Sequence, residues 1–263
     1  MSRVMLTIAY DGTQYHGYQI QDGVKTIEGE VSRALFELTG SECELIGGSR
    51  TDAGVHALSN VAVFDTNSSI PAEKFAYALN PHLPEDIKIV SSVLVPDDFH
   101  PRHCATTKTY EYHIYNAKFP DPTKRLYSHF SYTPYDIEAM RQAAKYMEGE
   151  HDFTSFCTVG AQVDSKVRTI YSVDVVDNKY NYVNRNGSED VSSDFPRDII
   201  IRVKGNGFLY NMVRIIAGTL MEVGAGRIKS TDITAIIDGC DRALAGPTAP
   251  ACGLTLMKFE FDE

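Results

Sequence analysis

The order of strand and helix patterns in the first hundred residues constrains the fold more than any other feature of the sequence. Four runs of β-branched and other apolar residues are typical of strands, at residues 3–9, 42–46, 61–64 and 87–95. Two helical patterns lie between them. One follows Thr26, a good N-cap residue, and the other begins at Pro71. The resulting order, β-α-β-β-α-β, is typical of a ferredoxin-like fold.

The rest of the chain repeats this order. Strand patterns occur at residues 108–116, 167–175, 199–203 and 254–261, and helical patterns begin at Thr133, Phe208 and Ser230. The polar stretch from Asn178 to Arg197, with Asn186-Gly187 inside it, predicts an exposed hairpin loop.

A polar connector, residues 96–103, marks the expected domain boundary. We therefore expect an α+β fold with an N-terminal half at residues 1–103 and a C-terminal half at residues 104–263. The second half shows no sequence repeat of the first, so the duplication is one of architecture.

The composition favours a cytoplasmic protein. No apolar run reaches the roughly 18 residues that a membrane-spanning helix needs, and the first residues lack a signal-peptide pattern. The five cysteines are scattered, without Cys-x-x-Cys spacing, which argues against a disulfide framework and against a zinc site.

The formal net charge of −10 argues against a nucleic-acid-binding surface unless Lys and Arg are segregated from the acids. Most of the candidate phosphate contacts lie in expected loops or at strand ends: Arg102, Lys108, Lys124, Arg125, Lys166, Arg168, Arg227, Lys229 and Arg242. Each of them alone is better explained as an ordinary solvated charge.

Residues 47–57, GGSRTDAGVHA, place one acid between glycine-bearing turns. Glycine permits positive φ and close backbone approach, and functional groups are often carried on loops held by a rigid scaffold. Asp52 is therefore a candidate functional carboxylate, with Arg50 two residues before it. The alternative is a turn in which the Asp side chain bonds its own backbone.

The pattern from Phe208 to Val223 is apolar on nearly every side, which predicts a buried helix. Arg214 lies within it. A buried guanidinium requires an anionic partner, because an unpaired buried charge is very costly. That partner is either a structural carboxylate nearby or Asp52.

Three further residues can be interpreted either as structural residues or as functional ones. Tyr110 shares a strand face with Tyr112, and tyrosine offers a flat surface on which an extruded base can stack. Leu256, on the last strand, either packs in the core or contacts such a base. His56 is interpreted as a packed loop histidine rather than a general base.

Residues 47–57, read with five other segments, resemble the TruA family of tRNA pseudouridine synthases. The segments occur in the family's order: YDGT at 10–13, YHGYQ at 15–19, KTYEY at 108–112, GFLYNMVR at 207–214 and AGPTAP at 245–250. The sequence departs from the family at Tyr18, where Trp is usual, and at Ser49, where Gly is usual.

The resemblance implies an isomerase that converts uridine to pseudouridine at positions 38, 39 and 40 in the anticodon arm of tRNA, without cofactor or metal. It implies Asp52 as nucleophile, Arg214 as its ion-pair partner, Tyr110 stacked on the target uracil, and Arg50 holding the extruded nucleotide. It also implies a homodimer that binds tRNA, with the two halves sharing one mostly antiparallel sheet and the active site in the cleft between them.

Three alternatives remain open at the level of sequence. The same chemistry could act on ribosomal RNA or on other tRNA positions. The chain could be a non-catalytic RNA-binding module, although binding alone needs no acid in the pocket. A glycoside or nucleoside hydrolase usually needs two carboxylates, and Asp11 is the second acid to consider.

Overall fold

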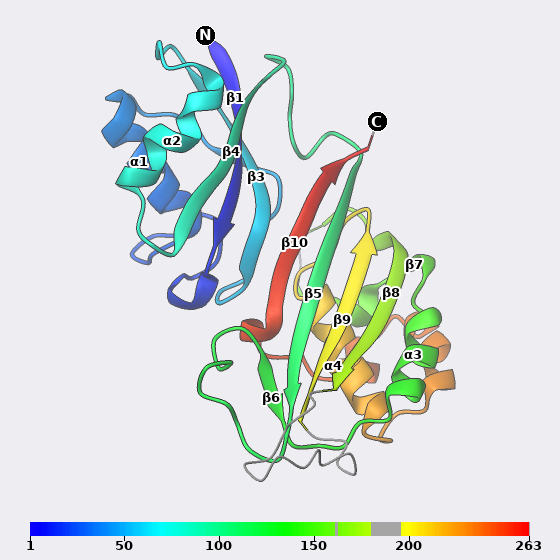
Figure 1. Cartoon of the computed structure of the whole chain (residues 1–263). Helices are drawn as coiled ribbons and strands as arrows, with labels where there is room; N and C mark the ends of the chain where they lie inside the picture. Colours follow the sequence, from blue (N-terminus) through cyan, green and yellow to red (C-terminus); the bar gives the residue numbers. More distant parts are fainter. Residues whose placement is uncertain (161–162, 180–195, 263) are drawn as a thin grey trace. The chain divides into compact units, whose positions relative to one another are not determined.

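The computed structural model describes residues 1–160, 163–179 and 196–262 (Figure 1). Within these ranges the chain forms ten strands and five α-helices, and most strand pairs are antiparallel. The predicted α+β class is therefore confirmed. Most of the predicted loop between Asn178 and Arg197, residues 180–195, lies outside the described residues.

The chain divides into two compact units. The first unit comprises Met1–Lys108 together with Thr255–Glu263, and the second comprises Thr109–Leu254. The last strand of the sequence therefore belongs to the unit that the first residues build.

The first unit contains a sheet in the order β4-β1-β3-β10, with the short strand β2 paired to β3. Its elements are β1 (Ser2–Tyr10), α1 (Ile27–Thr39), β2 (Ile46–Gly47), β3 (His56–Thr66), α2 (Phe75–Leu79), β4 (Ile87–Val95) and β10 (Leu254–Phe261). β10 runs parallel to β3, with Thr255 opposite His56 and Leu256 opposite Ala57. This pairing involves the last two residues of the 47–57 segment, so β10 supports the end of the loop that carries Asp52.

Two strands of this unit differ in length from the sequence prediction. The run at 42–46 forms a strand only at Ile46–Gly47, while the run at 61–64 extends to His56–Thr66. β3 pairs with β1 along nearly its whole length, from Ser2 opposite Thr66 to Tyr10 opposite Ala57. It is buried on both faces over much of its length, so the apolar/polar alternation that marks a half-exposed strand is absent.

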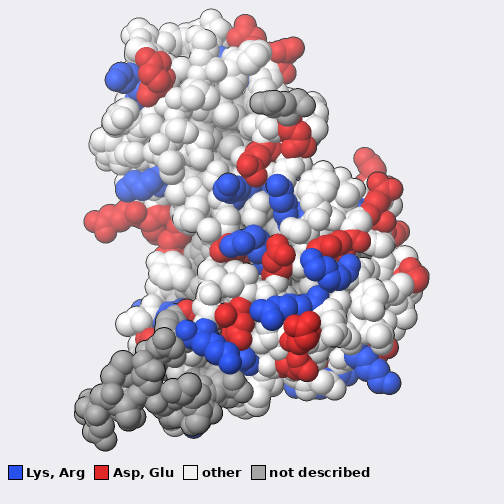
Figure 2. Space-filling view, turned by 45° about the vertical axis from the view of Figure 1, so that its right-hand side comes forward, with Lys and Arg blue, Asp and Glu red and all other residues white. Residues whose placement is uncertain are grey.

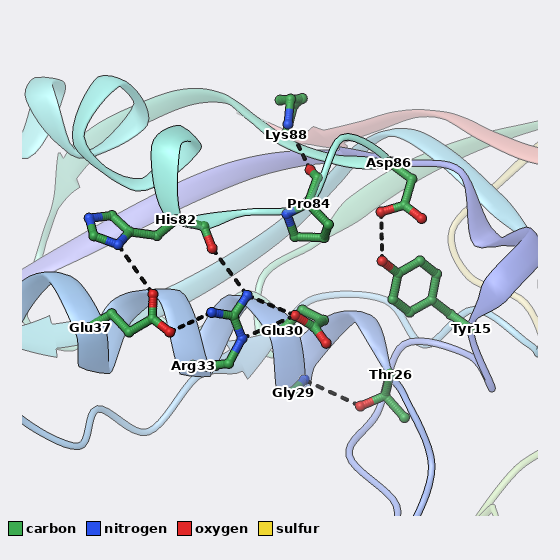
Figure 3. Close-up of polar contacts among 10 residues, drawn as sticks. All are labelled: Tyr15, Thr26, Gly29, Glu30, Arg33, Glu37, His82, Pro84, Asp86 and Lys88. Carbon is green, nitrogen blue, oxygen red and sulfur yellow. Dashed lines mark hydrogen bonds and ion pairs between the residues drawn. The ribbon is translucent and has the colours of Figure 1, made fainter.

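Polar contacts fix helix α1 and the segment that follows β1 (Figure 3). Thr26 caps α1, as predicted, by accepting a hydrogen bond from the Gly29 N–H. Arg33 bonds Glu30 and Glu37 on its own helix and donates to the backbone carbonyl of His82. These bonds tie α1 to the turn that leads into β4.

The second unit contains strands in the order β5-β9-β8-β7, with β6 parallel to β5. Its elements are β5 (Thr106–Asn116, which begins in the first unit), β6 (His129–Ser131), α3 (Ile137–Lys145), β7 (Gly149–Asp152), β8 (Val167–Lys179), β9 (Arg197–Gly205), α4 (Met212–Gly224) and α5 (Ile233–Asp238). The short strands β6 and β7 were not predicted. α3 packs against α4 and β8.

Helix α4 is buried on nearly every side, as its apolar pattern predicted. It begins at Met212, four residues later than the pattern suggested. The delay has a backbone cause: Asn211 adopts the left-handed conformation with φ 61°, which a continuing right-handed helix does not accommodate.

The AGPTAP segment lies directly on the backbone of α4. A Cβ atom on Gly218 would be 1.8 Å from the Pro247 carbonyl oxygen, and one on Gly246 would be 2.6 Å from the Thr219 Cα. The Thr219 hydroxyl also accepts a hydrogen bond from the Gly246 N–H at 2.9 Å. Glycine at both positions thus permits a contact between two backbones, and this contact holds the 245–250 segment in place.

Among the described residues, no helix is long and apolar enough to cross a membrane.

We expect Gly218→Ala to destabilise the protein by about 2 kcal/mol or more, because overpacking of this kind usually costs 1–3 kcal/mol. Alanine normally favours a helix interior over glycine by about 1 kcal/mol, so the loss would identify the backbone contact as its cause. Urea unfolding measures it. Gly207→Ala is the control, since the nearest atom to its Cβ is 3.8 Å away. An unchanged midpoint for Gly218→Ala would contradict the contact.

A second prediction concerns the ion pair between β1 and β3. Arg3 bonds Asp65 through Nε at 2.8 Å and Nη2 at 2.6 Å, and this holds the pKa of Asp65 below its ordinary value of 3.8. A carboxylate with a depressed folded-state pKa contributes stability above its unfolded pKa, and that stability is lost as the pH falls through the folded value. Native protein should therefore exceed Asp65→Asn in stability at pH 6, and the difference should shrink below about pH 4.

Urea midpoints of both proteins between pH 6 and pH 3 measure this difference. Asp22→Asn, which removes an exposed acid outside the pair, is the control. A difference between native protein and Asp65→Asn that stays constant across this range would show that the ion pair is not its source.

Candidate active site

The loop that carries Asp52 is a tight turn between β2 and β3. The Gly48 N–H donates to the Val61 carbonyl at 2.8 Å, and the Val55 N–H donates to the carbonyl of Asp52 at 3.1 Å. Gly54, inside this turn, has φ 77°. Asp52 is half-buried and Arg50 is exposed. The carboxylate therefore stands at the start of a closed turn whose glycine conformation the sequence had indicated.

The 10–18 segment packs against this turn. The Tyr18 N–H donates to the Thr51 carbonyl at 3.0 Å, and the Gly54 N–H donates to the Tyr15 carbonyl at 3.2 Å. A Cβ on Gly12 would be 2.0 Å from the Val55 carbonyl oxygen, and one on Gly17 would be 2.8 Å from the Thr51 carbonyl oxygen. The YDGT and YHGYQ segments therefore brace the Asp52 turn, and their glycines admit its backbone.

A buried hydrogen-bond network fixes the start of the loop. The Asn60 side chain, fully buried on β3, donates to the Ser49 carbonyl at 2.9 Å and to the Tyr10 hydroxyl at 3.1 Å. The Tyr10 hydroxyl lies 2.8 Å from the Thr51 hydroxyl. The Lys108 ammonium donates to the Gly48 carbonyl at 3.2 Å. Together these bonds hold the residues on the N-terminal side of Asp52.

Neither Asn60 nor Tyr10 was predicted from the sequence to be a site residue. The available signal for Asn60 was a polar amide directly before the apolar run at 61–64. A buried polar group needs hydrogen-bond partners, so an amide in a buried strand indicates a network.

The segment also has a firm attachment to the start of β4. The Tyr15 hydroxyl donates to Asp86 at 2.6 Å, and the Asp11 N–H donates to the Asp86 carbonyl at 2.9 Å. Figure 3 shows the Tyr15 contact. Burial, followed by this hydrogen bond, raises the pKa of Tyr15 well above its ordinary value, so the hydroxyl stays protonated and remains a donor.

His56 and Asp11 contact each other and the 10–18 segment that packs against the turn. His56 is buried, and its Nδ1 is 3.1 Å from the Gly12 amide nitrogen and 3.1 Å from the Asp11 carboxylate. Asp11 also accepts from the Thr13 N–H at 2.9 Å. Both side chains thus bond the backbone of the 10–18 segment, which is the behaviour of residues that shape a loop.

The two departures from the family pattern are both buried. Ser49 contributes its backbone carbonyl to the Asn60 bond, a group that any residue supplies. The Tyr18 ring lies against Gly47, whose Cβ would be 2.4 Å from the ring. The Tyr18 hydroxyl has no hydrogen-bond partner among the described residues, and burial raises its pKa.

Leu256 is fully buried on β10, opposite Ala57. This burial is what the interpretation of Leu256 as a core residue predicts. It also places Leu256 beside β3, the strand that follows the Asp52 loop.

Tyr110 lies on β5 in the second unit. It is buried, and its ring meets Phe208 edge-on with centroids 5.3 Å apart and planes at 88°. Phe208 belongs to the GFLYNMVR segment, so two of the segments noted in the sequence meet here. The neighbouring Tyr112 donates its hydroxyl to the Pro250 carbonyl at 2.9 Å, which ties β5 to the AGPTAP segment.

Arg214 lies in the first turn of α4 and is half-buried. Its Nε donates to the Ala249 carbonyl at 2.8 Å, and its Nη1 donates to the Asn211 side-chain oxygen at 2.7 Å. The Ala249 N–H returns a bond to the Arg214 carbonyl at 3.1 Å. Because a guanidinium is planar, two fixed donors set the direction of all its other N–H groups.

The predicted site residues therefore fall into two sets. Arg50, Asp52 and Leu256 lie in the first unit, whereas Tyr110 and Arg214 lie in the second. Among the described residues, no group of three or more His, Cys, Asp or Glu side chains is arranged to hold a metal ion.

On one face of the molecule, Lys and Arg are not segregated from the acids in the way that the net charge would require. On the face in Figure 2, Lys and Arg side chains lie among Asp and Glu side chains. Two of the candidate phosphate contacts form ion pairs, Lys124 with Asp198 at 2.7 Å and Arg227 with Glu222. The predicted phosphate-binding surface therefore remains a prediction.

Comparisons with known proteins converge on one family. The sequence model of a family described as tRNA pseudouridine synthase matches residues 6–103 and 143–262. A protein named tRNA pseudouridine synthase A from Thermoanaerobacter sp. (strain X514) is 46% identical over 259 residues, which cover 98% of this chain and 99% of the relative. The protein of the same name from Bacillus subtilis (strain 168) is 43% identical over 263 residues, with 99% of each chain covered.

We expect Asn60→Ala to destabilise the protein by roughly 1–3 kcal/mol, because it leaves buried hydrogen-bonding groups of Ser49 and Tyr10 without their donor. Thermal or urea unfolding measures the loss. Asn67→Ala, at an exposed position just after the same strand, is the matched control. Equal effects of the two substitutions would contradict the role given to the Asn60 network.

Proposed function

Because the chain belongs to the tRNA pseudouridine synthase family, whose members are isomerases, we propose that it converts uridine to pseudouridine at positions 38, 39 and 40 in the anticodon arm of tRNA. The bond between C1′ and N1 of the uridine breaks, the uracil turns, and C5 bonds to C1′. The hydrogen on C5 leaves as a proton and N1 gains a proton, so the product is an isomer of the substrate.

Asp52 is the nucleophile in this proposal. The observation that carries it is the rigid support of one carboxylate: the 10–18 segment, the Asn60 network and β3 all hold the turn at whose start Asp52 stands. A positioned group reacts faster because the entropy of alignment has already been lost in folding. A hydrolase with two flanking carboxylates is less favoured, since Asp11 bonds the backbone of its own segment.

Arg214 pairs with Asp52 and keeps it ionised. The bonds from Arg214 to Ala249 and Asn211 support this role, because they fix the direction of the guanidinium before substrate arrives. An ionised carboxylate is the reactive form of the nucleophile.

The remaining predicted residues act on the substrate. Tyr110 stacks on the target uracil, Arg50 holds the nucleotide out of the stem, and Leu256 contacts the extruded base. Extruding a paired base costs a few kcal/mol, which contacts of this kind offset.

We further propose that the two halves share one sheet and enclose the site, and that two copies of the chain bind tRNA in the cytoplasm as a homodimer.

The test is the release of tritium from tRNA that is labelled at uracil C5. Native protein should release tritium, whereas Asp52→Asn should release none, because formation of the C5–C1′ bond expels that hydrogen. Asp65→Asn removes a carboxylate of the same unit outside the site and should retain release at native rates at pH 7. Sequencing of the treated tRNA should locate pseudouridine at positions 38, 39 and 40.

Each other outcome would change one part of the proposal: the substrate, the nucleophile or the class of protein. Release from ribosomal RNA but not from tRNA would retain the chemistry and replace the substrate. Release by Asp52→Asn at native rates would overturn the assignment of the nucleophile. Tight binding of tRNA by the native protein without any release would favour an RNA-binding module.

A further inference from the structure

The residue before α4 has an unusual backbone conformation. Asn211 has φ 61° and ψ 7°, in the left-handed region. Cys240 is the other described non-glycine residue with positive φ. This region is unfavourable for an L-residue, although less so for Asn than for most others. Such a conformation persists only where surrounding contacts require it, so contacts of Asn211 must hold it there.

The Asn211 side chain does not perform the usual task of an N-cap residue. An N-cap Asn normally accepts a hydrogen bond from a backbone N–H in the first turn of its helix. Asn211 makes no such bond. Its Oδ1 instead accepts from Arg214 Nη1 at 2.7 Å, and its Nδ2 donates to the Thr158 hydroxyl at 2.8 Å. The amide is therefore used to hold a side chain rather than to cap the helix.

The orientation of this amide is determined by its two partners. A guanidinium only donates hydrogen bonds, so the amide oxygen must face Arg214. The amide nitrogen then faces the Thr158 hydroxyl, which accepts. The Thr158 N–H also donates to the Tyr210 carbonyl at 3.2 Å. Two bonds thus fasten the segment around Thr158 to residues 210–211, and the amide cannot turn without breaking one of them.

Arg214 receives a second restraint from a different part of the chain. Its Nε donates to the Ala249 carbonyl at 2.8 Å. The segment that carries Ala249 is itself held against α4 by the glycine contact at Gly218. The guanidinium is consequently held by acceptors on two separate segments, the Asn211 amide oxygen and the Ala249 carbonyl.

We propose that Asn211 is a positioning residue that aims the Arg214 guanidinium, with Thr158 locking the Asn211 amide. The proposal rests on the proposed function, in which Arg214 pairs with Asp52. Asn211 acts only through Arg214, so its loss should slow the chemical step and leave tRNA binding largely intact.

Substitutions at two positions separate the effect of the Asn211 amide from the effect of its left-handed backbone. Asn211→Gly keeps access to the left-handed region and removes the amide. It should fold with a melting temperature close to native, lower kcat by about 10- to 100-fold through misplacement of the guanidinium, and change KM for tRNA by less than about 3-fold. Thr158→Val, which removes the hydroxyl at nearly constant shape, should lower kcat in the same direction by a smaller factor. Thr158→Ser keeps the hydroxyl and should match the native protein.

A double-variant cycle tests whether Asn211 acts through Arg214. In the Arg214→Lys background, Asn211→Gly should cause little further loss of tritium release. A native kcat for Asn211→Gly, or an equal loss in both backgrounds, would overturn the proposal. A rise in KM with unchanged kcat would also overturn it, because it would place Asn211 in tRNA binding.

A measurement without substrate separates this proposal from the proposed function. In the native protein, NMR should show slow hydrogen exchange at Arg214 Nε–H, and exchange should accelerate in Asn211→Gly and Thr158→Val but not in Thr158→Ser. If the native protein releases no tritium, the proposed function fails while this exchange pattern still supports or refutes the positioning of Arg214. Equal exchange in all four proteins would refute it.

Discussion

Backbone-to-backbone contact at glycine is the constraint on which the candidate site depends. In the first unit, the Asp52 turn approaches Gly12 and Gly17 so closely that a Cβ on either would meet a carbonyl oxygen. In the second unit, α4 meets the segment that supplies the Ala249 carbonyl at Gly218 and Gly246. Main-chain atoms move less than long side chains do, so groups anchored in this way are held more tightly than surface contacts would allow.

Hydrogen bonds to side-chain amides complete this support. Asn60 holds the residues before Asp52, and Asn211 holds Arg214. An amide both donates and accepts, so it can join two groups of opposite kind and specify the orientation of each. Asn211 lies in a segment that was noted in the sequence and Asn60 lies directly before the apolar run at 61–64, yet neither was identified as functional. Their role depends on partners distant in sequence, such as Ser49 with Asn60 and Thr158 with Asn211.

Local sequence patterns predicted the elements whose bounds do not depend on contacts with other parts of the chain. The strand at residues 87–95 and the cap at Thr26 were located correctly, because a regular strand and a capped helix carry their own signals. The burial of α4 also followed from its composition. The extent of β3 and the start of α4 were missed. The first depends on pairing with β1, and the second depends on the left-handed backbone of Asn211. The individual candidates Asp52 and Arg214 came from sequence, but the bonds that hold them did not.

The position of β10 has a consequence for the order in which the molecule can be completed during translation. β10 pairs with β3 directly after the Asp52 loop, and residues 255–261 are counted with the unit that residues 1–108 build. An emerging chain therefore leaves the His56–Ala57 end of β3 without its β10 partner while about 150 further residues are made. Domains generally fold in order as they leave the ribosome, yet this one lacks a strand until the second unit has been synthesised. Unpaired strand edges are prone to aggregation, so the nascent first unit is the stage at which chaperone contact would matter most.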